Sequence, residues 1–253
     1  MKLIRYQWKD QAVSYGWVHN DMVGEVEGDI FNEFRRHEAH IPLSQVKLLP
    51  PVLPSKIICV GRNYVAHALE HGAEIPEIPI LFLKPFSSLI GYQDEIRLPQ
   101  QSSQVEHEGE LVVVIGKRGH GITTEKAAEY ILGYSIANDV TARDLQRLDG
   151  QWTRGKGFDT FCPIGPWIET QFDPADAMLT CRVNNEIRQM VSTREMIFSI
   201  GQLVAFISSI MTLEPGDVIL TGTPAGVGPL HAGDLVEVEI EGIGVLSNPV
   251  VTE

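Results

Sequence analysis

Hydrophobic and polar residues alternate along the first fifty positions, as in β-strands that bury one face. The alternation is clearest in Val13–Val18 and Met22–Val26. The prolines of 49–54 exclude a helix, because proline lacks the backbone donor and fixes φ. We therefore expect residues 1–54 to form a small β-rich N-terminal module that ends in a proline-rich linker, and residues 55–253 to form a second, larger domain.

The rest of the chain continues with short apolar runs and a few helical patterns. Strands are predicted at Lys56–Gly61, Ile80–Lys84, Leu111–Ile115, Tyr134–Asn138, Val218–Thr221 and Leu235–Ile240. Helices are predicted at Asn63–Glu70, with Gly72 as a left-handed stop, and at Thr124–Leu132. A third helix is predicted after a capping box of Ser192 and Glu195, with its apolar face formed by Met196, Ile200, Leu203, Val204, Ile207 and Met211. Strands outnumber helices and do not alternate with them regularly, which favours a strand-rich α+β fold.

Composition and charge narrow the classes of partner. The 253 residues include 20 basic and 33 acidic ones, a net charge of −13. This acidity disfavours nucleic-acid binding and an anionic membrane surface, because both need clustered lysine and arginine. It leaves a small anionic substrate open, since a site can be positive inside an acidic protein. The most hydrophobic stretch, residues 196–211, is too short and too polar to span a bilayer.

The three cysteines are too few and too widely spaced for a disulfide framework or a zinc site. A reducing cytoplasm is the natural location for such a chain. Cys162 can be interpreted as a nucleophile, but an inert buried thiol is the more common role of a free cysteine.

Acidic residues gather at two strand boundaries. Glu108 and Glu110 precede the strand at 111–115, and their spacing places both carboxylates on one side of an extended chain. Asp139 closes the strand at 134–138. Together they would make an all-oxygen site that suits a hard cation, Mg²⁺ or Mn²⁺. Alone, the Glu-x-Glu pattern is more typical of a solvated strand face, which is our interpretation of Glu237 and Glu239. Glu106 is either a further member or exposed.

His67 and Glu70 form a second candidate pair. Residues three apart share a helix face, so the carboxylate can fix the imidazole tautomer and make His67 a general base. The alternative is an ordinary surface ion pair.

Polar and glycine-rich segments supply the remaining candidates. Arg143, Gln146 and Lys156 lie in one polar stretch, and a glycine-rich turn at 221–228 follows a strand. Such a turn can present N–H groups and a hydroxyl to a carboxylate. It is neither a P-loop nor a dinucleotide fingerprint.

Taken together, these segments resemble the fumarylacetoacetate hydrolase family over about residues 56–250. The segments that carry the resemblance are Val60-Gly61-Arg62-Asn63-Tyr64 with His67 and Glu70, Phe82-Leu83-Lys84-Pro85, His107-Glu108-Gly109-Glu110-Leu111, Asp139-Val140-Thr141-Ala142-Arg143-Asp144, Lys156 before Phe158, and Leu220 to Gly228. The resemblance implies a mixed β-sheet roll, a homodimer, and Mg²⁺ or Mn²⁺ held by Glu108, Glu110 and Asp139. It also implies that His67 and Glu70 activate water, and that Arg143, Gln146, Lys156 and Thr223 bind or polarise the substrate.

One position departs from the animal fumarylacetoacetate hydrolases, which have a further aspartate ligand where this chain has Val60. The chain is therefore more similar to the smaller branch of acylpyruvate hydrolases, 2-oxo-acid decarboxylases and 2-hydroxyhepta-2,4-diene-1,7-dioate isomerases.

Three hypotheses follow. The first is metal-dependent hydrolysis of a C–C bond in a 2,4-dioxo acid of the acylpyruvate or fumarylpyruvate type, through a pyruvate enolate held at the metal, with Lys156 stabilising the oxyanion. The second is decarboxylation of a 2-oxo diacid such as oxaloacetate, or isomerisation of a 2-hydroxy-diene diacid, at the same site. The third is a metal-binding scaffold without catalysis, which a broken dyad or a missing ligand would indicate; the sequence has neither.

Overall fold

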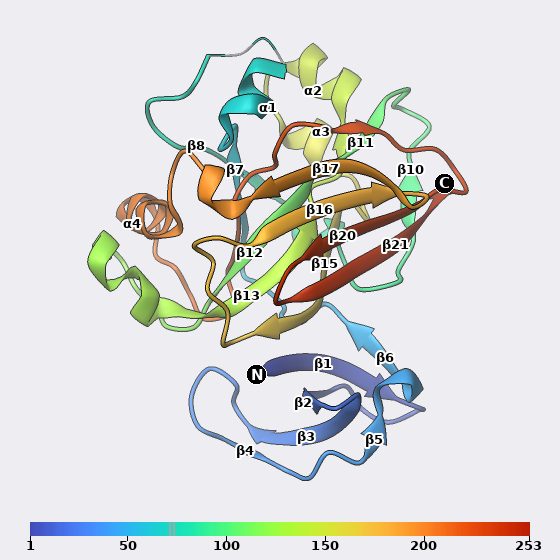
Figure 1. Cartoon of the computed structure of the whole chain (residues 1–253), viewed down its shortest axis with the longest axis vertical. Helices are drawn as coiled ribbons and strands as arrows, with labels where there is room; N and C mark the ends of the chain where they lie inside the picture. The colour runs from blue at the N-terminus through green and yellow to red at the C-terminus, as the bar shows by residue number, and fades with distance from the viewer. Residues whose placement is uncertain (71, 73) are drawn as a thin grey trace.

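A long mixed β-sheet runs through both parts of the chain in the computed structural model, which describes residues 1–70, 72 and 74–253 (Figure 1). Its main path follows the order β4-β3-β2-β1-β15-β13-β12-β18-β7-β8. Strands β5, β6 and β9 join it at the side. The strands are β1 (Lys2–Trp8), β2 (Ser14–His19), β3 (Met22–Gly28), β4 (Phe34–Arg36), β5 (Ile41–Pro42), β6 (Val46–Leu49), β7 (Ile57–Gly61), β8 (Ile80–Lys84), β9 (Leu89–Ile90), β12 (Gly109–Ile115), β13 (Ile131–Asn138), β15 (Cys162–Glu169) and β18 (Val218–Leu220).

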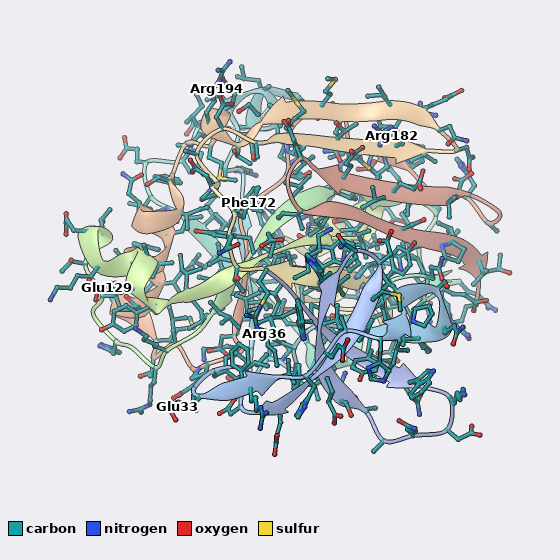
Figure 2. The ribbon with its side chains drawn as sticks, turned by 60° about the horizontal axis from the view of Figure 1, so that its bottom comes forward. Glu33, Arg36, Glu129, Phe172, Arg182 and Arg194 are labelled. Carbon is teal, nitrogen blue, oxygen red and sulfur yellow. The ribbon has the colours of Figure 1, made fainter. Side chains whose placement is uncertain are left out.

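A second sheet of five strands packs over the middle of the first and makes the fold a two-layered roll. It has the order β10-β21-β20-β16-β17. The five strands are β10 (Ile96–Leu98), β16 (Met178–Val183), β17 (Glu186–Ser192), β20 (Leu235–Ile240) and β21 (Gly244–Thr252). Apolar side chains from both sheets interdigitate between the layers, among them Leu111, Ile136, Leu179 and Val238. Arg182 and Arg194 lie on the outer side of the layer that β16 and β17 form (Figure 2).

Alternation along β20 matches the prediction. Val236, Val238 and Ile240 are buried, whereas Glu237 and Glu239 are only partly covered, and Glu239 forms an ion pair with Arg182. A small third sheet of β11 (Val105–His107), β14 (Thr141–Ala142) and β19 (Gly228–Pro229) stands beside the functional residues described below.

The helices are few and short, and their limits correct several predictions. The α-helices are α1 (Val65–Glu70), α2 (Arg143–Asp149), α3 (Thr153–Lys156) and α4 (Ile200–Ile210), and the 3₁₀ helices are η1 (Leu43–Gln45), η2 (Phe86–Ser88), η3 (Thr124–Tyr130) and η4 (Thr193–Glu195). The segment predicted as a helix from residue 124 to 132 is thus a 3₁₀ helix that ends at residue 130, and β13 begins directly after it. Gly72 has a φ of +61°, as expected for a left-handed stop.

The capping box lies seven residues later than predicted. Ser192 accepts a hydrogen bond from the Arg194 N–H, but it opens only the three-residue η4. The complete box consists of Ser199 and Gln202 at the start of α4. Leu203, Val204 and Ile207 form the buried face of this helix, as the apolar spacing predicts.

The N-terminal strands β1 to β6 form a module with a small core around Ile4, Tyr6 and Val23. This module adds to the long sheet edge to edge, because Lys2 and Leu3 of β1 pair with Glu169 and Ile168 of β15. The boundary at residue 54 stays a prediction. The strand-rich α+β class and the mixed-sheet roll are confirmed.

All three cysteines are free and buried. Burial raises the pKa of the Cys162 and Cys181 thiols to about 12, which makes both poor nucleophiles at neutral pH. Among the described residues, no helix combines the length and apolar character needed to cross a membrane.

Candidate active site

The ends of neighbouring strands bring three carboxylates together. Glu110 lies on β12, Glu108 immediately precedes that strand, and Asp139 immediately follows β13. Because Gly109 pairs with Asn138 across the two antiparallel strands, Asp139 lies beside Glu108, and its N–H donates to the Glu108 carbonyl at 2.8 Å. Oxygen atoms of the three carboxylates lie within 4.8 Å of one another, and all three residues are buried.

Two cations contact Glu108, and one of them also contacts Asp139. The Lys156 ammonium donates to Glu108 Oε2 at 2.7 Å and to Asp139 Oδ2 at 2.6 Å. The Arg143 guanidinium donates to Glu108, to Glu106 at 2.7 Å and to Gln146 at 2.6 Å. Burial favours the neutral Glu108 acid, but Lys156 and Arg143 outweigh it and hold the pKa of Glu108 well below its ordinary value. Glu108 is therefore ionised at neutral pH.

Glu110 lies in a different electrostatic environment. Its carboxylate accepts a hydrogen bond from the Gly222 N–H at 2.7 Å. Burial, together with the nearby charges of Asp139 and Glu108, raises the pKa of Glu110 well above its ordinary value. Three carboxylates this close repel one another, and a further positive charge between them would relieve the repulsion.

The donor set fits a divalent metal ion. It consists of carboxylate oxygens alone, which Mg²⁺ and Mn²⁺ prefer as ligands. The raised pKa of the buried Glu110 shows that its negative charge is unfavourable there, and a bound cation would stabilise that charge. Glu108, Glu110 and Asp139 are the residues that would hold such an ion.

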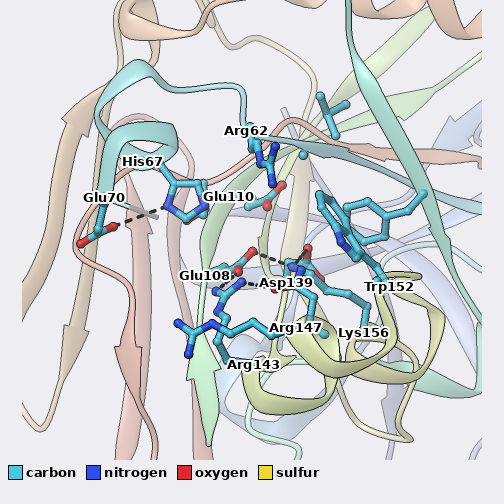
Figure 3. A pocket seen from close by; sticks show the side chains of 16 residues that line it. Arg62, His67, Glu70, Glu108, Glu110, Asp139, Arg143, Arg147, Trp152 and Lys156 are labelled. Carbon is cyan, nitrogen blue, oxygen red and sulfur yellow. Dashed lines mark hydrogen bonds and ion pairs between the residues drawn. The ribbon is translucent and has the colours of Figure 1, made fainter. Parts of the chain in front are cut away.

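His67 and Glu70 lie on α1 at one side of the triad (Figure 3). His67 Nδ1 is 3.6 Å from Glu70 Oε2, and His67 is buried while Glu70 is partly exposed. The Gly226 N–H donates to the Glu70 carboxylate at 3.1 Å, which ties α1 to the glycine-rich turn. The pair is thus part of the pocket wall rather than an ordinary surface pair.

A second network fixes the glycine-rich turn that carries Thr223. The Thr223 hydroxyl donates to the Gly109 carbonyl at 3.0 Å and accepts from the Gln189 side-chain amide at 2.8 Å. Asn63 lies behind the turn: its amide donates to the carbonyls of Thr221 at 2.8 Å and Phe198 at 3.1 Å, and it accepts from the Phe198 N–H at 2.7 Å. Gly222 passes so close that a Cβ there would lie 2.7 Å from the Asn63 Cβ.

Replacing Asn63 by alanine is expected to lower the free energy of unfolding by about 2–4 kcal/mol, because it leaves buried backbone groups without partners. Urea denaturation measures the loss. Asn32→Ala is the matched control, since Asn32 makes an exposed hydrogen bond to Asp29, and it is expected to cost less than about 1 kcal/mol. Equal losses in the two variants would contradict the assigned role of Asn63.

All nine predicted site residues line one cavity of about 450 Å³. They are His67, Glu70, Glu108, Glu110, Asp139, Arg143, Gln146, Lys156 and Thr223. Figure 3 shows His67 and Glu70 on one side, the carboxylates in the centre and Trp152 on the opposite side. The cavity can therefore bind a small polar molecule between a basic imidazole and a carboxylate cluster.

Several residues that contact the site were not predicted from the sequence. Lys84 donates to Asp139 at 2.5 Å and to the Val140 carbonyl at 3.1 Å from a fully buried position. Its signal was present, since it is the single charge in the apolar run 80–84. Gln189 gave no signal, because its contacts depend on how the second sheet packs. Glu106 is buried and forms an ion pair with Arg143, so the alternative that Glu106 is exposed is wrong.

Two protein-family models match the chain, one over each of its parts. The model described as fumarylacetoacetate (FAA) hydrolase, C-terminal, matches residues 56–251. The chain belongs to the fumarylacetoacetate hydrolase family. A second model, described as Rv2993c-like, N-terminal, matches residues 1–51.

Relatives of this family member include both uncharacterised proteins and enzymes. Protein Rv2993c of Mycobacterium tuberculosis is 55% identical over 83% of this chain and 80% of its own length. The mitochondrial oxaloacetate tautomerase fahd2 of Xenopus laevis is 47% identical over 82% of this chain and 69% of its own length.

Solved structures of family members share the whole fold. The 2-hydroxyhepta-2,4-diene-1,7-dioate isomerase of Mycobacterium marinum is 45% identical with a TM-score of 0.93, covering 100% of this chain and 99% of that one. Maleylpyruvate hydrolase from Sphingobium sp. SYK-6, in complex with manganese(II) and pyruvate, is 32% identical with a TM-score of 0.83 and covers the same shares. The family thus includes isomerases, tautomerases and hydrolases, and one of these homologues holds a divalent metal.

Proposed function

We propose that this protein is a Mg²⁺- or Mn²⁺-dependent hydrolase that cleaves the C3–C4 bond of a 2,4-dioxo acid into pyruvate and a carboxylic acid. The observation that supports it most directly is the placement of the His67–Glu70 pair beside a buried cluster of three carboxylates in one cavity. A cation site alone would serve several reactions, but a carboxylate-supported imidazole beside it adds a general base for water.

The residues take distinct roles in this proposal. A divalent ion held by the three carboxylates would polarise the 2-oxo group and stabilise negative charge on its oxygen. Arg143, Gln146 and Thr223 line the cavity and orient the acid, and Lys156 donates hydrogen bonds to a developing oxyanion.

Water activation falls to the imidazole. Glu70 faces His67 Nδ1, so Nε2 is the nitrogen that accepts the proton of water. The oxygen of that water attacks C4, the C3–C4 bond breaks, and the electron pair remains on the pyruvate fragment. The proton taken by His67 then returns to C3.

A second candidate is tautomerisation of a 2-oxo diacid such as oxaloacetate, favoured by the 47% identity to oxaloacetate tautomerase. This reaction needs a proton carrier and charge stabilisation at the 2-oxo oxygen, but no attack by water. The same carboxylates, with His67 or Lys156 as the carrier, would supply both.

Product analysis separates these candidates. The wild-type protein with Mg²⁺ or Mn²⁺ is incubated with 2,4-dioxopentanoate and, separately, with oxaloacetate. Hydrolysis predicts equimolar pyruvate and acetate from the first acid, quantified by NMR. Keto–enol exchange of oxaloacetate without any pyruvate or acetate from the dioxo acid would overturn the hydrolase and leave the tautomerase. No turnover of either acid would overturn both.

A further inference from the structure

Gln189 connects the second sheet with the residues of the cavity. Among the described residues, none of those that line the cavity lies on β10, β16, β17, β20 or β21. Gln189 is on β17, the outermost strand of this sheet (Figure 1), and only 1% of its surface is exposed. A buried side-chain amide needs partners for both N–H groups and for its oxygen, so its contacts show which groups it holds in place.

The amide of Gln189 is fully used by four contacts. Its Nε2 donates to Thr223 Oγ1 and to the Pro224 carbonyl, both at 2.8 Å. Its Oε1 accepts from the Gly109 N–H at 3.0 Å and faces His107 Nδ1 at 3.3 Å. A carbonyl can only accept and a backbone N–H can only donate, so Pro224 and Gly109 determine which end of the amide is the nitrogen. Gly109 lies between the two glutamates of the carboxylate triad, and one amide thus joins that segment to the glycine-rich turn.

The end of β18 explains why this connection is needed. β18 pairs with β12, and Thr221 extends the pairing by one hydrogen bond from its N–H to the Leu111 carbonyl at 3.1 Å. The strand ends before it reaches Gly109. There the Thr223 hydroxyl donates to the Gly109 carbonyl, and Gln189 accepts from the Gly109 N–H. Two side chains therefore replace a strand backbone at the position between the two glutamates.

Gln189 also fixes the direction in which the Thr223 hydroxyl donates. A hydroxyl carries one proton and accepts at its lone pairs. Because Gln189 Nε2 can only donate, the Thr223 oxygen accepts at that contact. The hydroxyl proton is then available to the Gly109 carbonyl or to an acceptor in the cavity, which Thr223 lines.

We infer that Gln189 is a positioning residue that sets the Thr223 hydroxyl as a hydrogen-bond donor to the acid bound in the cavity. This inference rests on the proposed function, which places the acid beside Thr223. An anionic oxygen is stabilised by a donor and not by an acceptor, so a hydroxyl whose accepting side is already occupied favours such a ligand. Gln189 does not itself line the cavity, and it acts on the ligand through Thr223.

Oxalate binding to the Mn²⁺-loaded protein, measured by calorimetry, tests the inference without turnover. Gln189→Met and Thr223→Val are each expected to weaken oxalate binding by about 10- to 100-fold, the usual effect of removing a supporting contact. If the two residues act as one unit, adding Gln189→Met to Thr223→Val weakens binding by less than about twofold more. Additive losses in the double variant would overturn the inference, and so would unchanged affinity in Gln189→Met.

Asn248→Leu is the matched control for a purely structural effect. Asn248 lies on β21 of the same sheet, is likewise 1% exposed, and donates to the carbonyls of Gly91 and Asp94 at 2.8 Å. The variant is expected to lose stability as Gln189→Met does, yet to bind oxalate within about twofold of the wild type. Equal losses of oxalate affinity in both variants would overturn the inference.

Two substitutions of Thr223 test the inference even if Gln189→Met does not fold. Thr223→Ser keeps the hydroxyl and is expected to bind oxalate within about threefold of the wild type. Binding of oxalate by Thr223→Val at wild-type strength would overturn the inference.

Turnover of 2,4-dioxopentanoate by the wild type separates the inference from the proposed function. If the acid is not cleaved but the losses of oxalate affinity are non-additive, the hydrolase proposal fails and the role of Gln189 stands. If the acid is cleaved and the losses are additive, the hydrolase stands and the role of Gln189 fails.

Discussion

His67→Ala is expected to lower kcat for hydrolysis of a 2,4-dioxo acid by about 10²- to 10⁴-fold, the range in which a positioned general base contributes. The imidazole is buried in the cavity wall, and Glu70 faces it at 3.6 Å. Without it, no residue in the proposal takes the proton of the attacking water. Steady-state kinetics with a coupled assay for pyruvate measures the effect, and Mn²⁺ binding is expected to stay within threefold of the wild type.

The chain contains a matched control for this variant. His231 and Asp234 are also three residues apart and lie 3.7 Å from each other, but His231 is exposed outside the cavity. His231→Ala is expected to leave kcat unchanged. Full activity of His67→Ala would refute the dyad. Glu70→Gln is expected to reduce kcat less than His67→Ala, because it removes only the orienting group.

Glu110→Gln is expected to weaken Mn²⁺ binding by at least about 100-fold, since it removes one of three carboxylate ligands. In the presence of a chelator, however, the same variant is expected to be at least as stable as the wild type. The reason is that burial and the neighbouring carboxylates raise the pKa of Glu110 in the folded state. Titration of Mn²⁺ and thermal unfolding in EDTA measure the two effects.

The raised pKa of Glu110 also predicts how the stability of the metal-free protein depends on pH. When the folded pKa exceeds the unfolded one, the folded state binds more protons, so stability falls as pH rises. Glu110 therefore contributes its full stability below about pH 4.5, its ordinary pKa, and loses it as pH rises through the higher folded pKa. Glu110→Gln is expected to flatten this decline.

Glu237→Gln is the control for the effects on Mn²⁺ binding and on pH-dependent stability. Glu237 and Glu239 on β20 have the same spacing as Glu108 and Glu110, but Glu237 lies away from the cavity. It is expected to bind Mn²⁺ normally and to keep the pH dependence of the wild type. Mn²⁺ at 100 times its Kd is expected to stabilise the wild type by about 2.7 kcal/mol and Glu110→Gln much less. Unchanged Mn²⁺ affinity in Glu110→Gln would exclude the triad as the metal site.

Much of the site could be predicted because its geometry is local. The alternate spacing of Glu108 and Glu110 and the place of Asp139 at a strand end both depend only on extended backbone. What could not be predicted was burial. A single Glu-x-Glu is normally solvated, and only the tertiary fold shows that Lys156 and Arg143 approach from α3 and α2 to balance Glu108.

Helix limits were less predictable, since they depend on competing hydrogen bonds. Ser192 was expected to open the long helix, but its hydroxyl donates to Asp176 while accepting from the Arg194 N–H. The residues after Ser192 therefore form only the short 3₁₀ helix η4. The helix α4 begins later, where Ser199 and Gln202 form the capping box. Gln189 and Asn63 were not identified for a related reason, because their partners lie far away in the chain.

The pairing of β1 with β15 has a consequence for synthesis of the protein. Leu3 leaves the ribosome well before its partner Ile168, which follows after a delay of about 10–30 s at ordinary elongation rates. During that interval β1, β2 and β3 can already pair with one another around their own small core. On its other edge β1 can pair early with β6 only at Arg5–Trp8, so Lys2 and Leu3 stay unpaired on that edge of the nascent chain until β15 has been synthesised.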